Sequence, residues 1–305
     1  MMLRPRCFGR TVLFLMIVAG PSASAQITSN PALPVTRGRG IVRVQAKLFQ
    51  ASAVNEVSDR SLTVFSIPLV AVYGVSPKLA VFGVVPVVRK RLETTELDLL
   101  AQGDTFVRGP TGLGDVRVFA RYIAFQSNHQ GRTMRVAPFA GVELPTGRND
   151  AADDRGRLPA SLQLGSGSWD PFAGFAFTWQ TLGWQINVAP AYQRNTAADG
   201  FRFGDQARVD AGFKVRVLPR TLGAGIPRFL YANLETNLIH NAASESDDEV
   251  IAGTGDTTWY LGPGMQFITQ RYIVEGAIQI PILQDLGEDA LRRDYIATLS
   301  VRLNL

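Results

Sequence analysis

The sequence predicts an all-β protein, a single transmembrane antiparallel up-and-down β-barrel of about twelve strands with its first and last strands paired. Three observations predict this fold. Apolar and polar residues alternate along most of the chain, which is the period of a strand whose two faces meet different surroundings. Short turns alternate with long polar loops, as in outer-membrane barrels. The N-terminus has the pattern of a secretion signal.

The first 25 residues read as a secretory signal peptide. Arg4, Arg6 and Arg10 form a basic region, residues 11–20 form a short apolar core, and residues 23–25 (Ala-Ser-Ala) provide a cleavage site. The apolar run is shorter than the roughly 20 residues that a membrane-spanning helix needs. We therefore expect export across the inner membrane, cleavage before Gln26 and, in a Gram-negative cell, residence in the outer membrane.

Composition excludes several classes of protein. The only cysteine, Cys7, lies in the predicted signal, so disulfides and cysteine metal sites are excluded from the mature chain. The formal net charge of +5 becomes about +2 once the three signal arginines are removed, which is too little to indicate nucleic-acid binding. Charged residues make up 19% of the chain, below the globular norm of about 25%.

Residues 26–40 hold two prolines and two glycines and have no periodicity, so we expect an irregular leader. A disordered arm is the expected form of this leader, and a plug inside the barrel is the alternative. The barrel then occupies residues 41–305. Its predicted strands are Ile41–Ala51, Ser61–Val75, Leu79–Arg89, Val116–Phe125, Thr133–Leu144, Trp169–Gln180, Trp184–Arg194, Asp205–Val217, Arg228–His240, Thr257–Ile268, Tyr272–Leu283 and Arg293–Leu305.

Loop lengths test this assignment independently. Junctions such as Ser76–Lys78, Thr181–Gly183 and Thr269–Arg271 are short, whereas the junctions between them run longer and more polar, above all Lys90–Leu113 and Pro145–Ser168. An even number of strands with both termini on the short-turn side is typical of an outer-membrane barrel. A soluble β-sandwich, the alternative that alternation alone leaves open, has no reason to segregate its loops in this way.

The last strand alternates cleanly up to Leu305, with Ala297, Leu299 and Val301 on one face and Thr298 and Ser300 on the other. We expect it to close the barrel by pairing antiparallel with Ile41–Ala51. The segment Tyr295–Leu305 is also the expected signal for the outer-membrane assembly machinery, although it ends in Leu305 where an aromatic residue is commoner.

Charged residues recur on the polar face of the strands. On the lipid face an Arg or Lys would cost about 2–4 kcal/mol at the midplane, so these side chains should point into the lumen. They would either pair across a narrow lumen and fill it, or line a water path. The predicted lumen residues are Arg43, Lys47, Arg117, Arg121, Arg135, Glu143, Arg208, Asp210, Lys214, Arg216, Glu235, Glu275 and Arg302, with Asp115 and Asp205 beside them.

Three glycine-rich segments carry a family resemblance: Gly112–Asp115 (GLGD), Glu143–Gly147 (ELPTG) and Leu164–Asp170 (LGSGSWD). With these segments, residues 43–305 resemble the outer-membrane β-barrel family named for the MetA pathway of phenol degradation. The resemblance implies a barrel that moves small, often aromatic or hydrophobic compounds, and it carries no catalytic residue. Physically, the glycines and Pro145 suit loop-to-strand junctions, so a structural role is expected for them.

Catalysis and metal binding find little support. The two histidines, His129 and His240, lack a partnering serine pattern, and no Gly-x-Ser-x-Gly segment is present. The acidic pairs at Asp153–Asp154 and Asp247–Glu249 lack the ligand spacing of a calcium loop. We expect neither enzyme activity, nor a cofactor, nor a metal.

The predicted function is a channel or transporter for small, aromatic or hydrophobic molecules. Its partners would be outer-membrane lipid, the solute and the assembly machinery, and not nucleic acid. The alternatives are a closed structural or adhesive barrel whose outer loops are functional, and an outer-membrane barrel hydrolase.

Overall fold

The computed structural model describes residues 31–54, 58–96, 104–223, 228–287 and 290–305. The predicted signal peptide and residues 26–30 of the leader lie outside the described residues. The wall of the barrel is built from β1 (Gly40–Val54), β2 (Ser58–Gly74), β3 (Leu79–Glu96), β6 (Val116–Tyr122), β8 (Arg132–Leu144), β11 (Asp170–Thr181), β12 (Trp184–Gln193), β15 (Gln206–Leu218), β16 (Phe229–Asn241), β19 (Asp256–Ile268), β20 (Tyr272–Asp285) and β21 (Arg292–Asn304).

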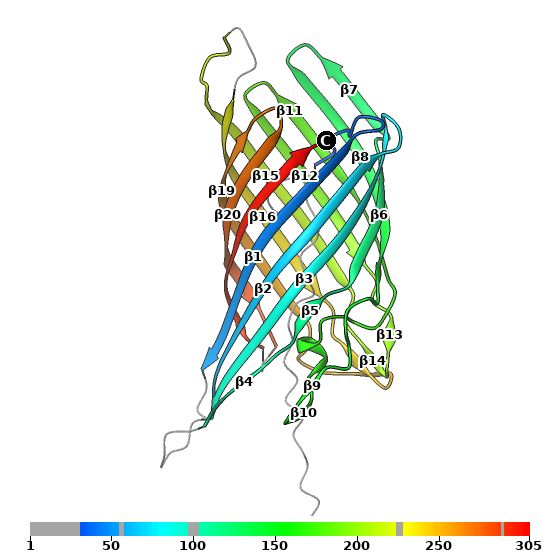
Figure 1. The fold of residues 1–305 in the computed structure, drawn as a ribbon, viewed down its shortest axis with the longest axis vertical. Helices are drawn as coiled ribbons and strands as arrows, with labels where there is room; N and C mark the ends of the chain where they lie inside the picture. Colours follow the sequence, from blue (N-terminus) through cyan, green and yellow to red (C-terminus); the bar gives the residue numbers. More distant parts are fainter. Residues whose placement is uncertain (1–30, 55–57, 97–103, 224–227, 288–289) are drawn as a thin grey trace, which may run out of the picture.

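These twelve strands form one closed antiparallel sheet in sequence order (Figure 1). The ring closes where β1 pairs with β21, with Arg43 opposite Arg302 and Lys47 opposite Thr298. One step beyond the ladder, the Leu305 N–H donates to the Gly40 carbonyl at 2.9 Å. The predicted fold class and the predicted pairing of first and last strands are both confirmed.

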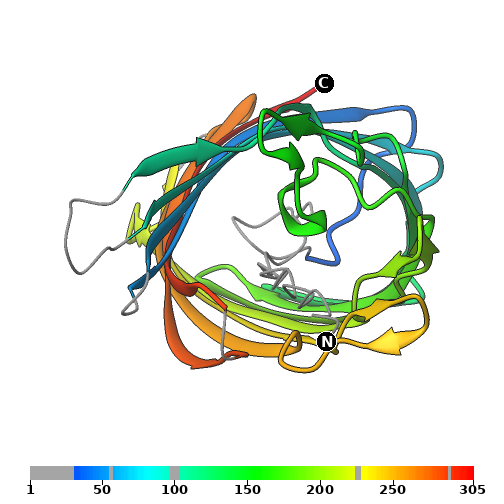
Figure 2. The same cartoon turned by 90° about the horizontal axis from the view of Figure 1, so that it is seen from below.

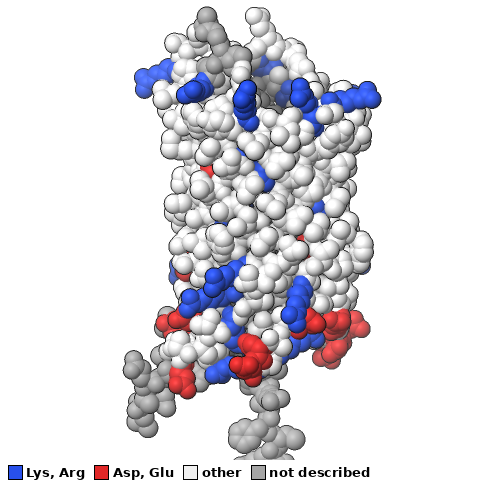
Figure 3. Space-filling view, viewed as in Figure 1, with Lys and Arg blue, Asp and Glu red and all other residues white. Residues whose placement is uncertain are grey.

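The wall has apolar residues outside and polar residues inside. On neighbouring positions of β1, Val44 is 43% exposed whereas Arg43 is only 2% exposed. In a water-soluble protein this order would be reversed, because burial of apolar area is the main driving force for folding. Figure 3 shows the result from one side: charged side chains gather at the two ends and leave a broad, nearly uncharged band between them. This is the surface that a membrane-spanning barrel presents to lipid.

No helix in the described part of the chain is long and apolar enough to cross a membrane.

The Lys90–Leu113 segment, predicted as a loop, contains further strand structure. β3 continues to Glu96, and β4 (Thr105–Arg108) and β5 (Thr111–Leu113) both pair with it. After β6 the short strand β7 (Phe125–His129) likewise pairs with β8. The prediction ended β3 too early because the charged run Arg89–Arg91 breaks the apolar pattern, although alternation of exposed and buried side chains continues through it.

Two of the long loops are joined to each other. β13 (Ala197–Ala198) and β14 (Phe201–Arg202) form a hairpin in one loop, and β17 (Glu245–Ser246) and β18 (Glu249–Val250) form one in the next. β14 pairs with β17, so the four strands make a small separate sheet. The ion pair Arg202–Glu245, 2.7 Å long, crosses the same junction.

The loop of residues 145–168 folds into the mouth of the barrel. It carries β9 (Ala152–Asp153), β10 (Gly156–Arg157) and the 3₁₀ turn η1 (Ala160–Leu162), and it crosses the ring of strands in Figure 2. Leu158 and the fully buried Leu162 pack in one apolar cluster with Leu62 and Leu92 of the inner wall and with Leu291. We call residues 145–168 the inner loop.

The described part of the leader, residues 31–39, also lies inside the ring of strands (Figure 2), and it leads into β1 at the end of the barrel opposite the inner loop (Figure 1). Ala32 is fully buried against Ala137, Ala176 and Ala189 of the wall, and its N–H donates to Thr178 Oγ1 at 2.7 Å. The expectation of a free arm was therefore wrong for these residues. A proline-rich segment without ladder bonds can occupy a lumen when inward-facing polar side chains satisfy its backbone.

Candidate functional site

The lumen is the candidate site, and its two sides differ in chemistry. The strands β3, β6, β8 and β11 place phenylalanines inward, whereas β1, β15, β16, β19, β20 and β21 place charged and amide side chains inward. These groups of strands occupy opposite parts of the ring. We call them the aromatic wall and the polar wall.

The aromatic wall is a set of four rings, one from each of four neighbouring strands. Phe82 stacks on Phe119 with ring centroids 4.4 Å apart and planes 9° apart. Phe119 also meets Phe139 at 6.1 Å and the edge of Phe172 at 5.8 Å. Each such pair contributes about 0.5–1.5 kcal/mol beyond its area burial, and together the rings form one apolar, aromatic patch.

An arginine lies on each side of Phe119 along β6. The guanidinium carbon of Arg121 is 4.8 Å from the Phe82 ring centroid, and that of Arg117 is 5.6 Å from the Phe172 ring centroid. Arg121 donates to the Pro31 carbonyl at 2.7 Å and to the Leu33 carbonyl at 2.5 Å, which holds the leader in place. Arg117 pairs with Glu143 on β8. The two arginines therefore flank the aromatic wall. Arg121 joins it to the leader, and Arg117 joins it to Glu143.

The polar wall is centred on a buried ion pair. Arg43 Nη2 lies 2.8 Å from Glu275 Oε1, and both side chains are almost fully buried. Ser300 accepts from Arg43 and donates to Glu275, at 2.9 and 3.0 Å. Gln266 donates to Glu275 at 2.6 Å and accepts from Lys214 at 3.1 Å. Five strands are thus linked by one hydrogen-bonded network, which is what a buried charge requires.

A second group lies further along the same wall. Arg208 pairs with Asp210 at 2.7 Å, Asn237 donates to Asp210 at 2.6 Å, and Gln279 donates to Asn237 at 2.7 Å. This group pairs charges of opposite sign and links them through amides. The predicted lumen residues of the polar wall nevertheless include more cations than anions, so the wall offers hydrogen bonds to a solute together with an excess of positive charge.

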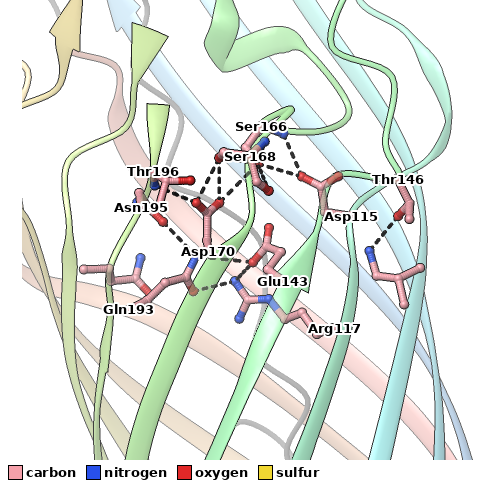
Figure 4. A network of polar contacts seen from close by, with 12 residues as sticks. Asp115, Arg117, Glu143, Thr146, Ser166, Ser168, Asp170, Gln193, Asn195 and Thr196 are labelled. Carbon is pink, nitrogen blue, oxygen red and sulfur yellow. Dashed lines mark hydrogen bonds and ion pairs between the residues drawn. The ribbon is translucent and has the colours of Figure 1, made fainter. Parts of the chain in front are cut away.

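The three glycine-rich segments converge on one anchor for the inner loop (Figure 4). Asp115 accepts from the Gly147 N–H at 2.8 Å, from the Ser166 N–H at 2.6 Å and from the Ser166 hydroxyl at 3.1 Å. Asp170 accepts from Ser168 at 2.9 Å and from the Thr196 N–H at 2.8 Å. Burial raises the pKa of Asp115, and the hydrogen bonds from Ser166 and Gly147 oppose that shift.

Glycine is required where the two ends of the inner loop touch. A Cβ on Gly165 would lie 2.5 Å from Asp115 Oδ1 and 2.6 Å from the Gly147 carbonyl oxygen, and one on Gly147 would lie 2.8 Å from Gly165 Cα. The structural role expected for these glycines follows from this close approach. The resemblance segments therefore hold the inner loop in the mouth instead of lining a binding surface themselves.

Lys90 holds the inner loop from the opposite side. Its ammonium donates to the carbonyls of Ser161 at 2.9 Å and Gln163 at 2.5 Å. Gln163 in turn accepts from the Ala151 N–H at 2.8 Å and donates to the Leu158 carbonyl at 2.9 Å. The backbone of the inner loop is satisfied by these side chains, as a buried loop needs.

The charged residues predicted for the lumen sit in different surroundings. Buried residues of the set are Arg43, Lys47, Arg117, Arg121, Glu143, Asp210, Lys214, Glu235 and Glu275, whereas Arg135, Arg208, Arg216 and Arg302 are partly buried. Arg135 donates to Thr133 at 3.1 Å. Asp115 belongs to the loop anchor, and Asp205 accepts from Asn195 and Arg202 at 2.9 and 3.2 Å beside the small loop sheet. Their roles toward a solute stay predictions.

The sequence reasoning missed the aromatic wall and Lys90. Phe119 lies between Arg117 and Arg121 at every second position of the strand, so the sequence pattern already placed its ring on the same, inward face. β2 and β3 gave no signal because they are apolar on both faces, and the structure shows why: Val70, Val72, Phe82 and Val84 face a second apolar cluster inside the barrel.

Groups suited to metal binding or catalysis do not assemble among the described residues. No cluster of three His, Cys, Asp or Glu side chains that could hold a metal ion occurs in that part of the chain. His240 Nδ1 lies 2.9 Å from Thr257 Oγ1, and His129 Nε2 lies 3.1 Å from Ser127 Oγ in β7.

Several solved structures are similar to the chain, and the first of those described here, with a TM-score above 0.5, supports the fold. The crystal structure of the COG4313 outer membrane channel from Pseudomonas putida F1 superposes with a TM-score of 0.64 at 13% identity, covering 89% of this chain and 97% of that chain. The transport unit of the autotransporter AIDA-I from Escherichia coli gives 0.46 at 12% identity, covering 88% and 90%. The CymD monoaromatic hydrocarbon channel gives 0.38 at 9% identity, covering 88% and 89%.

No curated protein matches the sequence. The sequence profile of the family described as MetA-pathway of phenol degradation matches residues 57–276, which is more than two thirds of the chain. The protein, a closed antiparallel β-barrel, belongs to the family of the MetA-pathway of phenol degradation.

Proposed function

We propose that the protein is an outer-membrane channel for small aromatic or hydrophobic molecules. The observation that carries this proposal is the two-sided lumen: a cluster of four phenylalanines in mutual contact faces a hydrogen-bonding wall inside a closed barrel. A molecule with an apolar ring and one polar substituent finds a partner for each part. The family name, which refers to phenol degradation, supports an aromatic solute, and the name of the similar P. putida protein supports an outer-membrane channel.

The location and partners follow from the same surface. The lipid-facing band, the predicted signal peptide and the closing strand Tyr295–Leu305 support residence in the outer membrane of a Gram-negative cell and recognition by its assembly machinery. We propose no catalytic step and no cofactor. The charged lumen residues are proposed to line and brace the path.

Reconstituted protein tests the proposal by liposome swelling. Benzenesulfonate is a suitable probe because its sulfonate prevents passage through lipid alone, and glucose serves as a hydrophilic comparison. Phe119→Leu removes the central ring while keeping an apolar side chain, and the loss of about 0.5–1.5 kcal/mol of ring contact predicts benzenesulfonate entry about 2- to 13-fold slower. Glucose entry should change little.

Phe213→Leu is the matched control, because Phe213 is 45% exposed on the outer face. It should leave both rates unchanged. If the wild-type protein gives no ion conductance and admits neither solute, the channel proposal is wrong. That result is the one expected of the second candidate, a closed barrel whose outer loops are functional, which the inner loop and the leader favour because both occupy the lumen.

A further inference from the structure

A small pocket lies at the end of the barrel opposite the inner loop, between the leader and the polar wall. Its volume is about 210 Å³, and Pro31 and Leu33 of the leader cover one side of it. The other sides come from wall strands near their short turns, among them β15, β16, β19, β20 and β21. Sites for drug-sized ligands occupy about 300–1,000 Å³, so this smaller pocket suits a molecule with a single ring.

Apolar side chains line one part of the pocket. Ile273 on β20 is 5% exposed, and it lies opposite Ile268 on β19 in the ladder. Leu33, which is half-buried, enters from the leader, and the half-buried Tyr231 adds an aromatic ring from β16. A ring placed among these side chains loses its contact with water, which is the main favourable contribution to the binding of an apolar group.

Two cations line the remaining part of the pocket. Lys214 on β15 is 7% exposed, donates to Gln266 Oε1 at 3.1 Å and lies 5.0 Å from the centroid of the Tyr231 ring. Arg302 on β21 donates from Nε to Asn304 Oδ1 at 3.3 Å, and this is its only hydrogen bond within the described residues. An ammonium has three donors and a guanidinium has five, so both cations keep donors that the chain does not use.

Neither cation has a carboxylate of its own. Lys214 and Arg302 take part in no ion pair in the part of the chain that the structure describes. Buried cations are normally paired, because removing a charge from water is costly. Other cations inside the barrel follow this rule, in the pairs Arg43–Glu275, Arg117–Glu143, Arg208–Asp210 and Arg293–Asp256.

The carboxylates of the polar wall do not balance this charge. Glu235 and Glu275 attract Lys214 over a longer distance, but both of them also attract Arg43. Arg121, which holds the leader, adds a further positive charge that is close enough to repel the arginine of the pocket. An excess of cations therefore surrounds the pocket, and an anion meets a favourable potential there.

A polar group beside Lys214 is also unused. Asn233 lies opposite Lys214 in the ladder between β15 and β16, and it is 5% exposed. Neither its amide nitrogen nor its amide oxygen has a hydrogen-bond partner among the described residues. Because buried amides are almost always bonded, an unbonded one indicates a partner that the chain itself does not supply.

We propose that this pocket binds an aromatic carboxylate, a single ring that carries one carboxylate group. The carboxylate accepts hydrogen bonds from Arg302 and Lys214, and a planar guanidinium suits it because two parallel N–H groups can reach its two oxygens. The ring lies among Leu33, Ile268 and Ile273. The inference rests on the proposed function and names its solute more closely, as an aromatic acid in the charged form.

Binding to the purified barrel tests the pocket without requiring transport. Equilibrium dialysis at neutral pH compares three probes: benzoate, benzyl alcohol, which keeps the ring without the charge, and acetate, which keeps the charge without the ring. Benzoate should bind saturably and at least about tenfold more tightly than either of the others, since hydrogen bonds to charged groups and burial of the ring each contribute on that scale.

Substitutions in the pocket separate the two parts of the site. Arg302→Gln and Lys214→Met should each weaken benzoate binding by about tenfold or more, while the weak binding of benzyl alcohol stays unchanged. Leu33→Ala should weaken the binding of benzoate and benzyl alcohol several-fold and leave that of acetate unchanged. Heat-dependent gel migration shows whether each variant folds, and the three probes on the wild-type protein decide the question if a variant does not.

Arg271→Gln is the matched control. Arg271 is an exposed arginine in the turn before β20, at the same end of the barrel and outside the pocket. This variant removes one positive charge, as Arg302→Gln does, and should bind benzoate as tightly as the wild-type protein.

Three results would overturn the assignment. These are no saturable binding of millimolar benzoate, binding of benzyl alcohol or acetate as tight as that of benzoate, and an equal loss in Arg302→Gln and Arg271→Gln, which would show a general effect of net charge. Failure of the proposed function looks different: liposome swelling would then show no entry of benzenesulfonate, while the purified wild-type protein still binds benzoate.

Discussion

Asp115 should decide whether the inner loop stays in the mouth of the barrel. The change to test is Asp115→Ala, which removes the acceptor for the Gly147 and Ser166 N–H groups and for the Ser166 hydroxyl. Two backbone donors left without partners cost about 1–3 kcal/mol each. The raised pKa of Asp115 shows that burying its charge offsets part of that contribution, which places the expected loss near the low end, at about 2 kcal/mol.

A loss of about 2 kcal/mol raises the population of the released loop about 30-fold, since 1.4 kcal/mol corresponds to a factor of ten. Single-channel recording should therefore show frequent steps to a higher conductance. Trypsin cleavage at the exposed Arg148 should accelerate in parallel, because cleavage follows the open population when reclosing is fast. The barrel itself should keep its heat-dependent gel migration, since none of its ladders involves Asp115.

Asp115→Asn is the control for this reasoning. It keeps one acceptor oxygen and removes the buried charge, so its effect on conductance should be clearly smaller than that of Asp115→Ala. If Asp115→Ala leaves both the conductance and the cleavage rate unchanged, the anchor does not hold the loop, and the glycine-rich segments need another explanation.

Three further results are expected. Arg43→Met leaves Glu275 buried without its ion-pair partner and should lower the free energy of unfolding in lipid by about 3–5 kcal/mol. The double variant Arg43→Met/Glu275→Gln should recover part of this loss. Denaturant titration measures both variants, and a loss in the double variant equal to the sum of the two single losses would contradict the pairing. Gly165→Val places a carbon atom within 2.6 Å of the Gly147 carbonyl oxygen and should release the inner loop as strongly as Asp115→Ala. Single-channel recording should show the same steps to a higher conductance. A recording identical to that of the wild-type protein would refute the close approach. The hydrogen bonds from Arg108, at 2.7 and 2.8 Å, lower the pKa of Asp153. The contact between β4 and β9 should therefore persist below the usual titration range of aspartate and be lost as the pH falls through the lowered pKa. An NMR titration of the Asp153 carboxyl measures this pKa, and a midpoint in the ordinary range would show that the hydrogen bonds do not form in solution.

The wall of the barrel could be predicted because each strand is a local pattern. Alternation such as Val209, Ala211 and Phe213 against Arg208 and Asp210 requires no knowledge of neighbours. Pairing of the first and last strands followed from the closure rule for barrels, and the register of Arg43 with Arg302 agrees with it. Lipid on one side and a polar lumen on the other make the alternation stronger than in a soluble sheet.

The contents of the lumen could not be predicted, because they depend on contacts between distant segments. Lys90 is one cation in a charged run, and nothing nearby indicates that it binds carbonyls of Ser161 and Gln163 some seventy residues later. Phe82 and Phe139 lie in apolar stretches where either face could be inward. The leader has no periodicity, and the contacts that fix its place, among them those with Arg121 and Thr178, come from strands far along the chain.

The joining of β1 to β21 has a consequence for how the barrel is made. Arg43 and Ser300, which are bonded across that junction, are 257 positions apart in the chain. Such a contact closes a very long loop and forms late, because local contacts are cheaper in chain entropy. Residues 31–39 lead directly into β1, so they travel with the edge that completes the ring. When β1 pairs with β21 and closes the barrel, residues 31–39 are therefore placed in the lumen in the same step. They do not have to enter a barrel that is already closed.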